Sequence, residues 1–133
     1  QNAQKMKDSL APTLDESASA LLTDLAQRGM LEETLVVINA EFGRTPKINS
    51  NQGRDHWPFV YSLALAGAGI QGGAVFGKSD KSAAYPTENP RDPADMAATI
   101  YHLLGINPDT RIYDNIQRPH SLVIGSPIEE LLA

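Results

Sequence analysis

Two apolar runs constrain the fold of this chain more than any other feature. Residues 34–40 read TLVVINA and residues 60–66 read VYSLALA, and neither run alternates between apolar and polar positions. Strands buried on both faces have this pattern, which is typical of a parallel sheet covered by helices. We therefore expect an α/β fold with a mostly parallel sheet.

A charged segment links the two runs. The first run ends in Glu41, and Arg44, Arg54, Asp55 and His56 follow before the second run begins. Loops at the carboxyl ends of buried strands often carry functional residues. We expect residues 35–58 to carry part of a metal-dependent active site, with the rest of that site outside this chain.

Helical spacing of apolar residues predicts two helices. The first has one apolar face, formed by Leu14, Ala18, Leu21, Leu22 and Leu25. It is expected to begin at a capping box of Thr13 and Glu16 and to end at Gly29. Pro12 is expected to interrupt the weakly helical residues that precede this helix. The second starts at Asp92 and Pro93, carries Met96, Ile100, Leu103 and Leu104, and ends at Gly105. We also expect short strands at residues 74–77 and 122–124, and a last short helix after Ser126.

A G-x-G-x-x-G pattern follows the second apolar run at Gly67, Gly69 and Gly72. A dinucleotide site needs the third glycine to open a helix. Here two more glycines, an aromatic residue and a proline follow, so we expect a flexible turn instead.

The composition argues against several classes of partner and of site. The hydrophobic content of 41% and charged content of 20% are ordinary for one globular domain. The net charge of −5 argues against a nucleic acid or an anionic membrane as the partner. No apolar run approaches the roughly 18 residues of a membrane span, and the absence of cysteine excludes disulfides and thiolate metal sites.

The beginning of the chain is unusual. It starts at Gln1 without a methionine or a signal pattern, which is typical of a piece cut from a longer protein. Two buried strands also cannot form a stable parallel sheet alone. We expect the sheet edges to be completed by a missing N-terminal segment or by a homo-oligomer.

Glu41 and His56 are the candidate metal ligands. A carboxylate at the end of a strand can coordinate a divalent cation or act as a general base, but it can equally pair with Arg44 to order the turn. A neutral imidazole is a common zinc ligand, and Asp55 could fix its tautomer. Alternatively, the Trp and Pro that follow hold His56 as a structural loop residue.

Arg44 and Arg54 are candidates for gripping a tetrahedral oxyanion, because a guanidinium group pairs bidentately with phosphate or sulfate. The alternative is that they neutralise Glu41 and Asp55. The other titratable and nucleophilic residues attract no role: His102 is expected on the helix surface, His120 is expected to be structural, and Thr45, Ser50 and Ser62 have no base beside them.

Four segments of the chain resemble the C-terminal part of the DUF1501 family, which is related to sulfatases and alkaline phosphatases. They are LLTDLAQRGMLEETLVVINAEFGRTPKIN, GRDHWPFVYSLALAGAGIQGG, YPTENPRDPADMAATIYHLLGI and RPHSLVIGSPIEELL. The resemblance implies an alkaline-phosphatase-like three-layer α/β/α fold with a mostly parallel sheet, of which residues 1–133 form one C-terminal portion. It also implies a metal-centred site at the edge of the sheet and export to the periplasm or cell surface.

The same resemblance implies roles for particular residues. Glu41 takes the place of a metal-binding Asp, and His56 resembles a later metal-binding His. Phe42 departs from the pattern, because it stands where related enzymes have a His ligand. The nucleophile and the other ligands would come from upstream sequence, and the Cys-x-Pro-x-Arg signature of sulfatases is absent.

We therefore expect a fragment of a metal-dependent hydrolase of phosphate or sulfate esters. Glu41 and His56 would bind zinc, calcium, magnesium or manganese, while Arg44, Arg54 and Asp55 would serve catalysis on a small anionic ester. The chain alone is expected to be inactive. The alternative, of a different class, is a non-catalytic binding or assembly domain that keeps the fold.

Overall fold

The computed structural model describes residues 2–133, and side chains from residue 3 onward. Its helical elements are α1 (Asn2–Lys5), the π-helical turn η1 (Met6–Leu10), α2 (Ala11–Gln27), the 3-10 turn η2 (Leu31–Glu33), α3 (Pro93–Leu103) and the 3-10 turn η3 (Glu129–Leu131). Its strands are β1 (Val36–Ile38), β2 (Gly43–Arg44), β3 (His56–Trp57), β4 (Ala64–Ala66), β5 (Lys78–Ser79), β6 (Pro86–Glu88), β7 (Arg111–Tyr113) and β8 (Pro119–Ser121).

The expected three-layer α/β/α fold with a mostly parallel sheet is wrong. The described residues form four separate two-stranded pairs, β1–β4, β2–β3, β5–β6 and β7–β8, and all four are antiparallel. An uninterrupted apolar run indicates burial but does not specify the direction of the neighbouring strand. Here the chain reverses between the two runs, so the second run returns antiparallel to the first.

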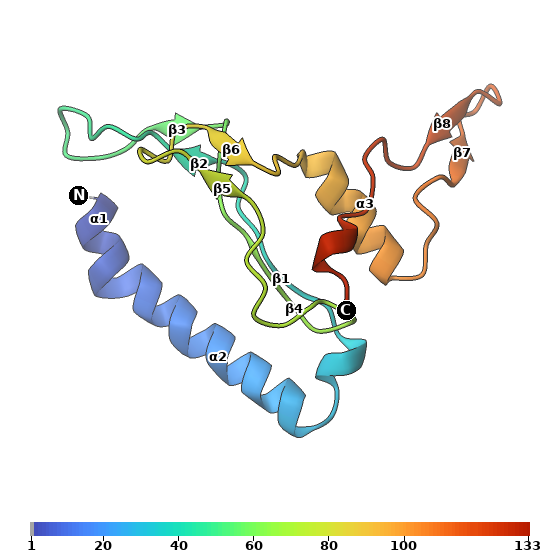
Figure 1. Ribbon diagram of the computed structural model, residues 1–133, viewed down its shortest axis with the longest axis horizontal. Coiled ribbons are helices and arrows are strands. Elements are labelled where there is room, and N and C mark those ends of the chain that lie inside the picture. Colours follow the sequence, from blue (N-terminus) through green and yellow to red (C-terminus); the bar gives the residue numbers. More distant parts are fainter. Residues whose placement is uncertain (1) are drawn as a thin grey trace.

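The pairs β1–β4 and β2–β3 belong to one long hairpin, which runs diagonally across Figure 1. Ile38 pairs with Ala64 at the end of the β1–β4 ladder, and Gly43 pairs with Trp57 at the start of the β2–β3 ladder. Residues 39–42 lie between these pairs on one side and residues 58–63 on the other, so the second side carries two extra residues. An irregularity of this kind bends a hairpin and re-aims its side chains.

The N-terminal elements α1, η1 and α2 form one continuous helix, because the junction residues Lys5 and Ala11 are both helical. At about 1.5 Å per residue it is roughly 39 Å long. Pro12 does not break it, contrary to the expectation. The π-helical turn lies directly before Pro12, where the ring would otherwise clash with a carbonyl of the preceding turn.

The C-terminal ends of both long helices and the start of α3 follow the sequence prediction, but the capping box expected at Thr13 and Glu16 is wrong. Thr13 lies inside the helix, where its Oγ1–H donates to the Ser9 carbonyl at 2.9 Å. Gly29 has φ +69°, and the N–H of Met30 donates to the Leu25 carbonyl at 2.9 Å, as in a Schellman motif. Gly105 has φ +73° and ends α3 in the same way. At the start of α3, the Asp92 N–H donates to Asp95 Oδ2 at 3.1 Å, which confirms the predicted cap.

Other local predictions differ from the structure. Residues 74–77 and 122–124 are irregular rather than extended into strands, and the strands nearest to them are β5 and β8. The last helix is only the 3-10 turn η3. The turn-rich segment after α3 contains the hairpin β7–β8, which projects from the rest of the chain (Figure 1).

The buried core is small and lies mainly around α3. Five of the described residues are buried: Leu25, Met96, Ala98, Thr99 and Ile128. By contrast, the long N-terminal helix packs mainly on η2, and Leu14 and Leu21 on its apolar stripe remain 52% and 49% exposed. Figure 1 shows this helix apart from the long hairpin.

The accessible surface of the chain is 9867 Å². A compact monomer of 14.4 kDa exposes about 6800 Å². The chain therefore leaves accessible a surface that a compact domain of this mass would bury.

None of the helices in the described part of the chain has the length and apolar character needed to cross a membrane.

Candidate functional site: an arginine–histidine depression on the long hairpin

The charged segment singled out from sequence forms the end of the long hairpin rather than a loop. The N–H of Thr45 donates to the Asp55 carbonyl at 3.0 Å, which continues the β2–β3 ladder toward the tip. At the tip, Asn49 Oδ1 accepts the N–H groups of Asn51 and Gly53, both at 3.0 Å. Asparagine stabilises tight turns in this way. The functional candidates are therefore held on an ordered hairpin.

Four of the predicted site residues surround one shallow, open depression of about 440 Å³: Arg44, Arg54, Asp55 and His56. Arg44 and His56 are direct cross-strand partners in the β2–β3 ladder. Side chains of directly opposed residues project from the same face of a strand pair. The backbone register thus brings a guanidinium group and an imidazole together.

The two arginines have different surroundings. Arg54 Nη1 donates to the carbonyls of Thr45 and Pro46 at 2.7 and 2.6 Å, so this side chain braces the opposite strand. Among the described residues, the one hydrogen-bond partner of Arg44 is the Arg54 carbonyl, which lies 3.5 Å from Nη1. A guanidinium group has five N–H donors. Arg44 therefore keeps most of its donors available for an anion in the depression.

His56 rests on Phe42. The two rings stack with centroids 3.9 Å apart and planes inclined by 29°, and Cζ of Arg44 lies 5.7 Å from the centroid of the same Phe42 ring. The sequence marks Phe42 only as a residue that departs from a family pattern. The alternation of side chains along an extended strand, which places residues 42 and 44 on one face, is the signal that could have revealed this contact.

Asp55 and Glu41 do not occupy the positions that a complete metal site would require. Asp55 Oδ1 accepts the Asn49 side-chain amide at 2.9 Å and so braces the hairpin tip. Glu41 lies outside the residues that line the depression. Its carboxylate makes no hydrogen bond or ion pair with any residue in the described part of the chain, including Arg44.

A divalent cation needs more donors than the described residues bring together. Within residues 2–133, no three His, Cys, Asp or Glu side chains lie close enough together to hold a metal ion. Glu41 and His56 have the right donor chemistry for zinc, but a zinc site with three or four protein ligands needs more donors than these two. The described residues therefore do not form a metal site by themselves.

The opposite side of the hairpin end is anchored by Trp57. Its Nε1–H donates to the Ala84 carbonyl at 2.7 Å, and its ring packs edge-on against Phe59 and Tyr85 at centroid distances of 5.0 and 5.7 Å. These contacts join the long hairpin to the β5–β6 hairpin. The anchor holds β3, and hence His56, in place from behind.

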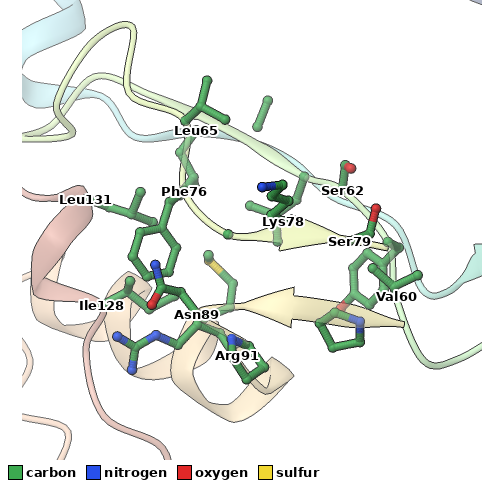
Figure 2. A pocket seen from close by; sticks show the side chains of 18 of the residues that line it. Val60, Ser62, Leu65, Phe76, Lys78, Ser79, Asn89, Arg91, Ile128 and Leu131 are labelled. Carbon is green, nitrogen blue, oxygen red and sulfur yellow. The ribbon is translucent and has the colours of Figure 1, made fainter. Parts of the chain in front are cut away.

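A second, larger cavity of about 700 Å³ lies between the β4 side of the long hairpin, residues 73–79 and the start of α3. Figure 2 shows Phe76, Ile128 and Leu131 at one end, and Val60, Ser62 and Ser79 at the other. No motif in the sequence predicts this cavity.

The charged groups at the second cavity are mostly paired. Lys78 bridges to Glu88 at 2.8 Å and Arg91 to Glu130 at 2.7 Å, and Arg91 also lies over Phe76 at 5.4 Å. In the arginine–histidine depression, by contrast, the charged group of Arg44 forms no ion pair with the described residues and makes one long hydrogen bond, so the depression is the better candidate site for an anion.

The glycine pattern forms a turn, as expected. Gly67 and Gly69 have φ +78° and +84°, and no helix begins at Gly72. A Cβ on Gly67 would lie 2.2 Å from the Thr34 carbonyl oxygen, so only glycine allows this close approach. The geometry serves the β1–β4 hairpin and lacks the helix that a dinucleotide site requires.

The remaining histidines lie away from the depression. His102 is exposed on α3, as predicted. His120 Nε2 lies 3.3 Å from Asp114 Oδ2 in the β7–β8 hairpin. Hydrogen bonds from the Arg118 backbone and side chain, followed by His120, lower the pKa of Asp114. This cluster closes a hairpin turn.

The long hairpin thus carries a candidate anion-binding site. This site is the open depression lined by the cross-strand partners Arg44 and His56. The model of the family described as "Protein of unknown function (DUF1501)" matches residues 1–132, and the chain therefore belongs to the DUF1501 family. Searches of curated proteins and of solved structures found no match.

Proposed function

We propose that the depression binds the tetrahedral oxyanion of a phosphate or sulfate ester, and that the chain contributes it to a metal-dependent hydrolase. The observation that carries the proposal is the direct pairing of Arg44 with His56 in the β2–β3 ladder. Arg44 supplies N–H donors in a planar fork that matches phosphate and sulfate. Arg54 holds the opposite strand in place through its carbonyl contacts.

A metal ion in this proposal needs donors beyond the described residues. Glu41 and His56 would supply a carboxylate and an imidazole, and the other ligands would come from another polypeptide segment, either a further part of the protein or a second copy. When bound, zinc, manganese, magnesium or calcium would polarise the ester and stabilise negative charge on its oxygens. Asp55 supports the hairpin tip beside these residues.

The motifs EFGRTP and GRDHWP support a relationship to sulfatases and alkaline phosphatases, which act on such esters. These motifs supply Arg44 in one case and Arg54, Asp55 and His56 in the other. The proposed relationship rests on these motifs and on the chemistry of the depression.

Ligand binding by the chain tests the proposal directly. Because His56 and Glu41 are too few donors for a complete zinc site, we expect the isolated chain to bind zinc only weakly but measurably, and to bind inorganic phosphate or sulfate, by isothermal titration calorimetry. His56→Ala should weaken zinc binding by roughly tenfold or more. Arg44→Gln should weaken phosphate or sulfate binding by about tenfold, since hydrogen bonds to charged groups are the strong ones.

Two matched variants control for general effects of charge and ring loss. His102→Ala removes an exposed histidine on α3, and Arg111→Gln removes an exposed arginine on β7. Both should bind zinc and phosphate like the unaltered chain. Equal affinities for the His56 and His102 variants, together with equal affinities for the Arg44 and Arg111 variants, would refute the assignment.

A second candidate function is a non-catalytic binding or assembly domain. It is supported by the exposed apolar stripe of the N-terminal helix and by the large accessible surface, which suit association with another polypeptide. Hydrolysis of nitrophenyl phosphate and nitrophenyl sulfate, with zinc, manganese, magnesium or calcium added, separates the two. Turnover that His56→Ala abolishes favours the hydrolase, whereas ligand-dependent association without turnover by the complete assembly favours the binding domain.

A further inference from the structure

Phe42 lies between the two groups on which the proposed site depends. Its ring stacks on the imidazole of His56 at 3.9 Å, while the guanidinium carbon of Arg44 lies 5.7 Å from the ring centroid. Phe42 itself is half-buried, whereas Arg44 and His56 are exposed. One half-buried aromatic ring thus lies against both of the exposed polar side chains.

The local backbone explains how the ring reaches this position. Phe42 and Arg44 flank Gly43, and alternation along an extended strand places both on the face that carries His56. Gly43 cannot carry a side chain, because a Cβ there would lie 2.1 Å from the Val60 carbonyl oxygen. The close approach of the two hairpin sides at Gly43 therefore fixes the direction in which Phe42 points.

We propose that Phe42 is a positioning residue that holds the imidazole of His56 and the guanidinium of Arg44 in a common orientation toward the depression. The π face of the ring attracts a cation above it and stacks against the imidazole. Without the ring, the side chains of Arg44 and His56 would sample more rotamers before they bind a ligand. The inference rests on the proposed function for the identity of that ligand.

The test combines a spectroscopic measurement with ligand affinity. A stacked phenyl ring shifts the ring protons of His56 upfield in the NMR spectrum, relative to those of the exposed His102. Phe42→Leu should remove this shift and weaken both zinc and inorganic phosphate binding by about three- to tenfold, as expected for the loss of an aromatic contact. Phe42→Tyr keeps the ring and should restore both the shift and the affinities.

Phe76→Leu is the matched control. Phe76 is half-buried like Phe42 and lies 5.4 Å from the guanidinium carbon of Arg91, but it lines the second cavity rather than the depression around His56. We expect this variant to leave the His56 proton shifts and both affinities unchanged. The fluorescence of Trp57, the single tryptophan of the chain, reports whether each variant keeps the fold of the hairpin.

The outcomes separate this inference from the proposed function. If the His56 protons resonate at the same position in the unaltered chain and in Phe42→Leu, the stacking contact is refuted whatever the chain binds. If they move while zinc and phosphate affinities stay equal, the contact exists but the positioning role is wrong. If the unaltered chain binds neither zinc nor phosphate, the proposed function fails, and the positioning role fails with it.

Discussion

At the residue scale, one buried hydroxyl holds the C-terminal tail against α3. Thr99 is fully buried, and its Oγ1–H donates to the Asp95 carbonyl at 2.7 Å. The same oxygen accepts the backbone N–H of Ile128 at 2.9 Å. A buried backbone N–H group requires a hydrogen-bond acceptor, so the Thr99 oxygen is needed for the tail to pack on α3 at Ile128.

Replacement of this hydroxyl should be costly. Thr99→Val keeps the shape of the side chain but leaves the Ile128 N–H unsatisfied, and it should lower the free energy of unfolding by about 1–3 kcal/mol. Thr99→Ser keeps the oxygen and should lose less. Chemical denaturation measures both, with the exposed Thr110→Val as a control expected within about 0.5 kcal/mol of the unaltered chain. A Thr99→Val loss no larger than that of the control would contradict this role.

The sequence predicted the helix ends that depend on Asp92, Gly29 and Gly105 better than it predicted the contacts within the candidate site. Asp92, Pro93, Gly29 and Gly105 act where expected, because capping depends on a few adjacent residues. The contacts of His56 depend instead on which residue lies opposite on another strand. Phe42 and Asn49, which contact the candidate site residues, therefore emerged only from the three-dimensional register.

At the element scale, a carboxylate links α3 to the tail. Asp95 Oδ1 accepts the backbone N–H of Ser126 at 3.0 Å, and Oδ2 accepts that of Asp92 at 3.1 Å. These two hydrogen bonds, with the charge of Arg91 nearby, lower the pKa of Asp95 from its ordinary value of 3.8, against a smaller opposing effect of burial. The ionised carboxylate is thus favoured in the folded chain.

The pH dependence of stability follows from that direction. Because the folded pKa of Asp95 lies below its unfolded value, its contribution is fully present above about pH 4 and is lost as the pH falls through the folded pKa. In urea denaturation, the free energy of unfolding of the unaltered chain should therefore exceed that of Asp95→Asn above pH 4, and this difference should shrink below pH 4. Asp109→Asn should show no such convergence, because the Asp109 side chain makes no comparable contacts within residues 2–133. An Asp95→Asn difference independent of pH would rule out this linkage.

Helices were predictable at this scale, but strand pairing was not. The apolar spacing of residues 14–25 and 96–104 identified both long helices, since each helix depends on local periodicity. The runs 34–40 and 60–66 contain β1 and β4 but carry no information on direction, and the polar segment between them was expected to be a loop. Its pairing depends on the turn at residues 49–53, which Asn49 organises.

At the scale of the whole molecule, the chain is open. Its accessible surface of 9867 Å² exceeds the value of about 6800 Å² expected for a compact monomer of this mass. The N-terminal helix, the long hairpin and the β7–β8 hairpin extend from a small core around α3 (Figure 1). Such a surface suits a chain that packs against a further polypeptide.

Small-angle X-ray scattering checks this shape. A compact chain of 133 residues has a radius of gyration of about 14 Å. We expect the monomeric chain, extrapolated to zero concentration, to have a clearly larger value. A measured radius of about 14 Å would show that the helix and the hairpins close onto one another in solution.

We propose that the depression around Arg44 and His56 is the functional site. Titration of the isotopically labelled chain with zinc and inorganic phosphate, followed by the backbone amide resonances in NMR, locates the residues that bind these ligands. We expect the largest shift changes at residues 41–45 and 54–57. Changes centred on the cavity beside Phe76, or no saturable change anywhere, would contradict the claim.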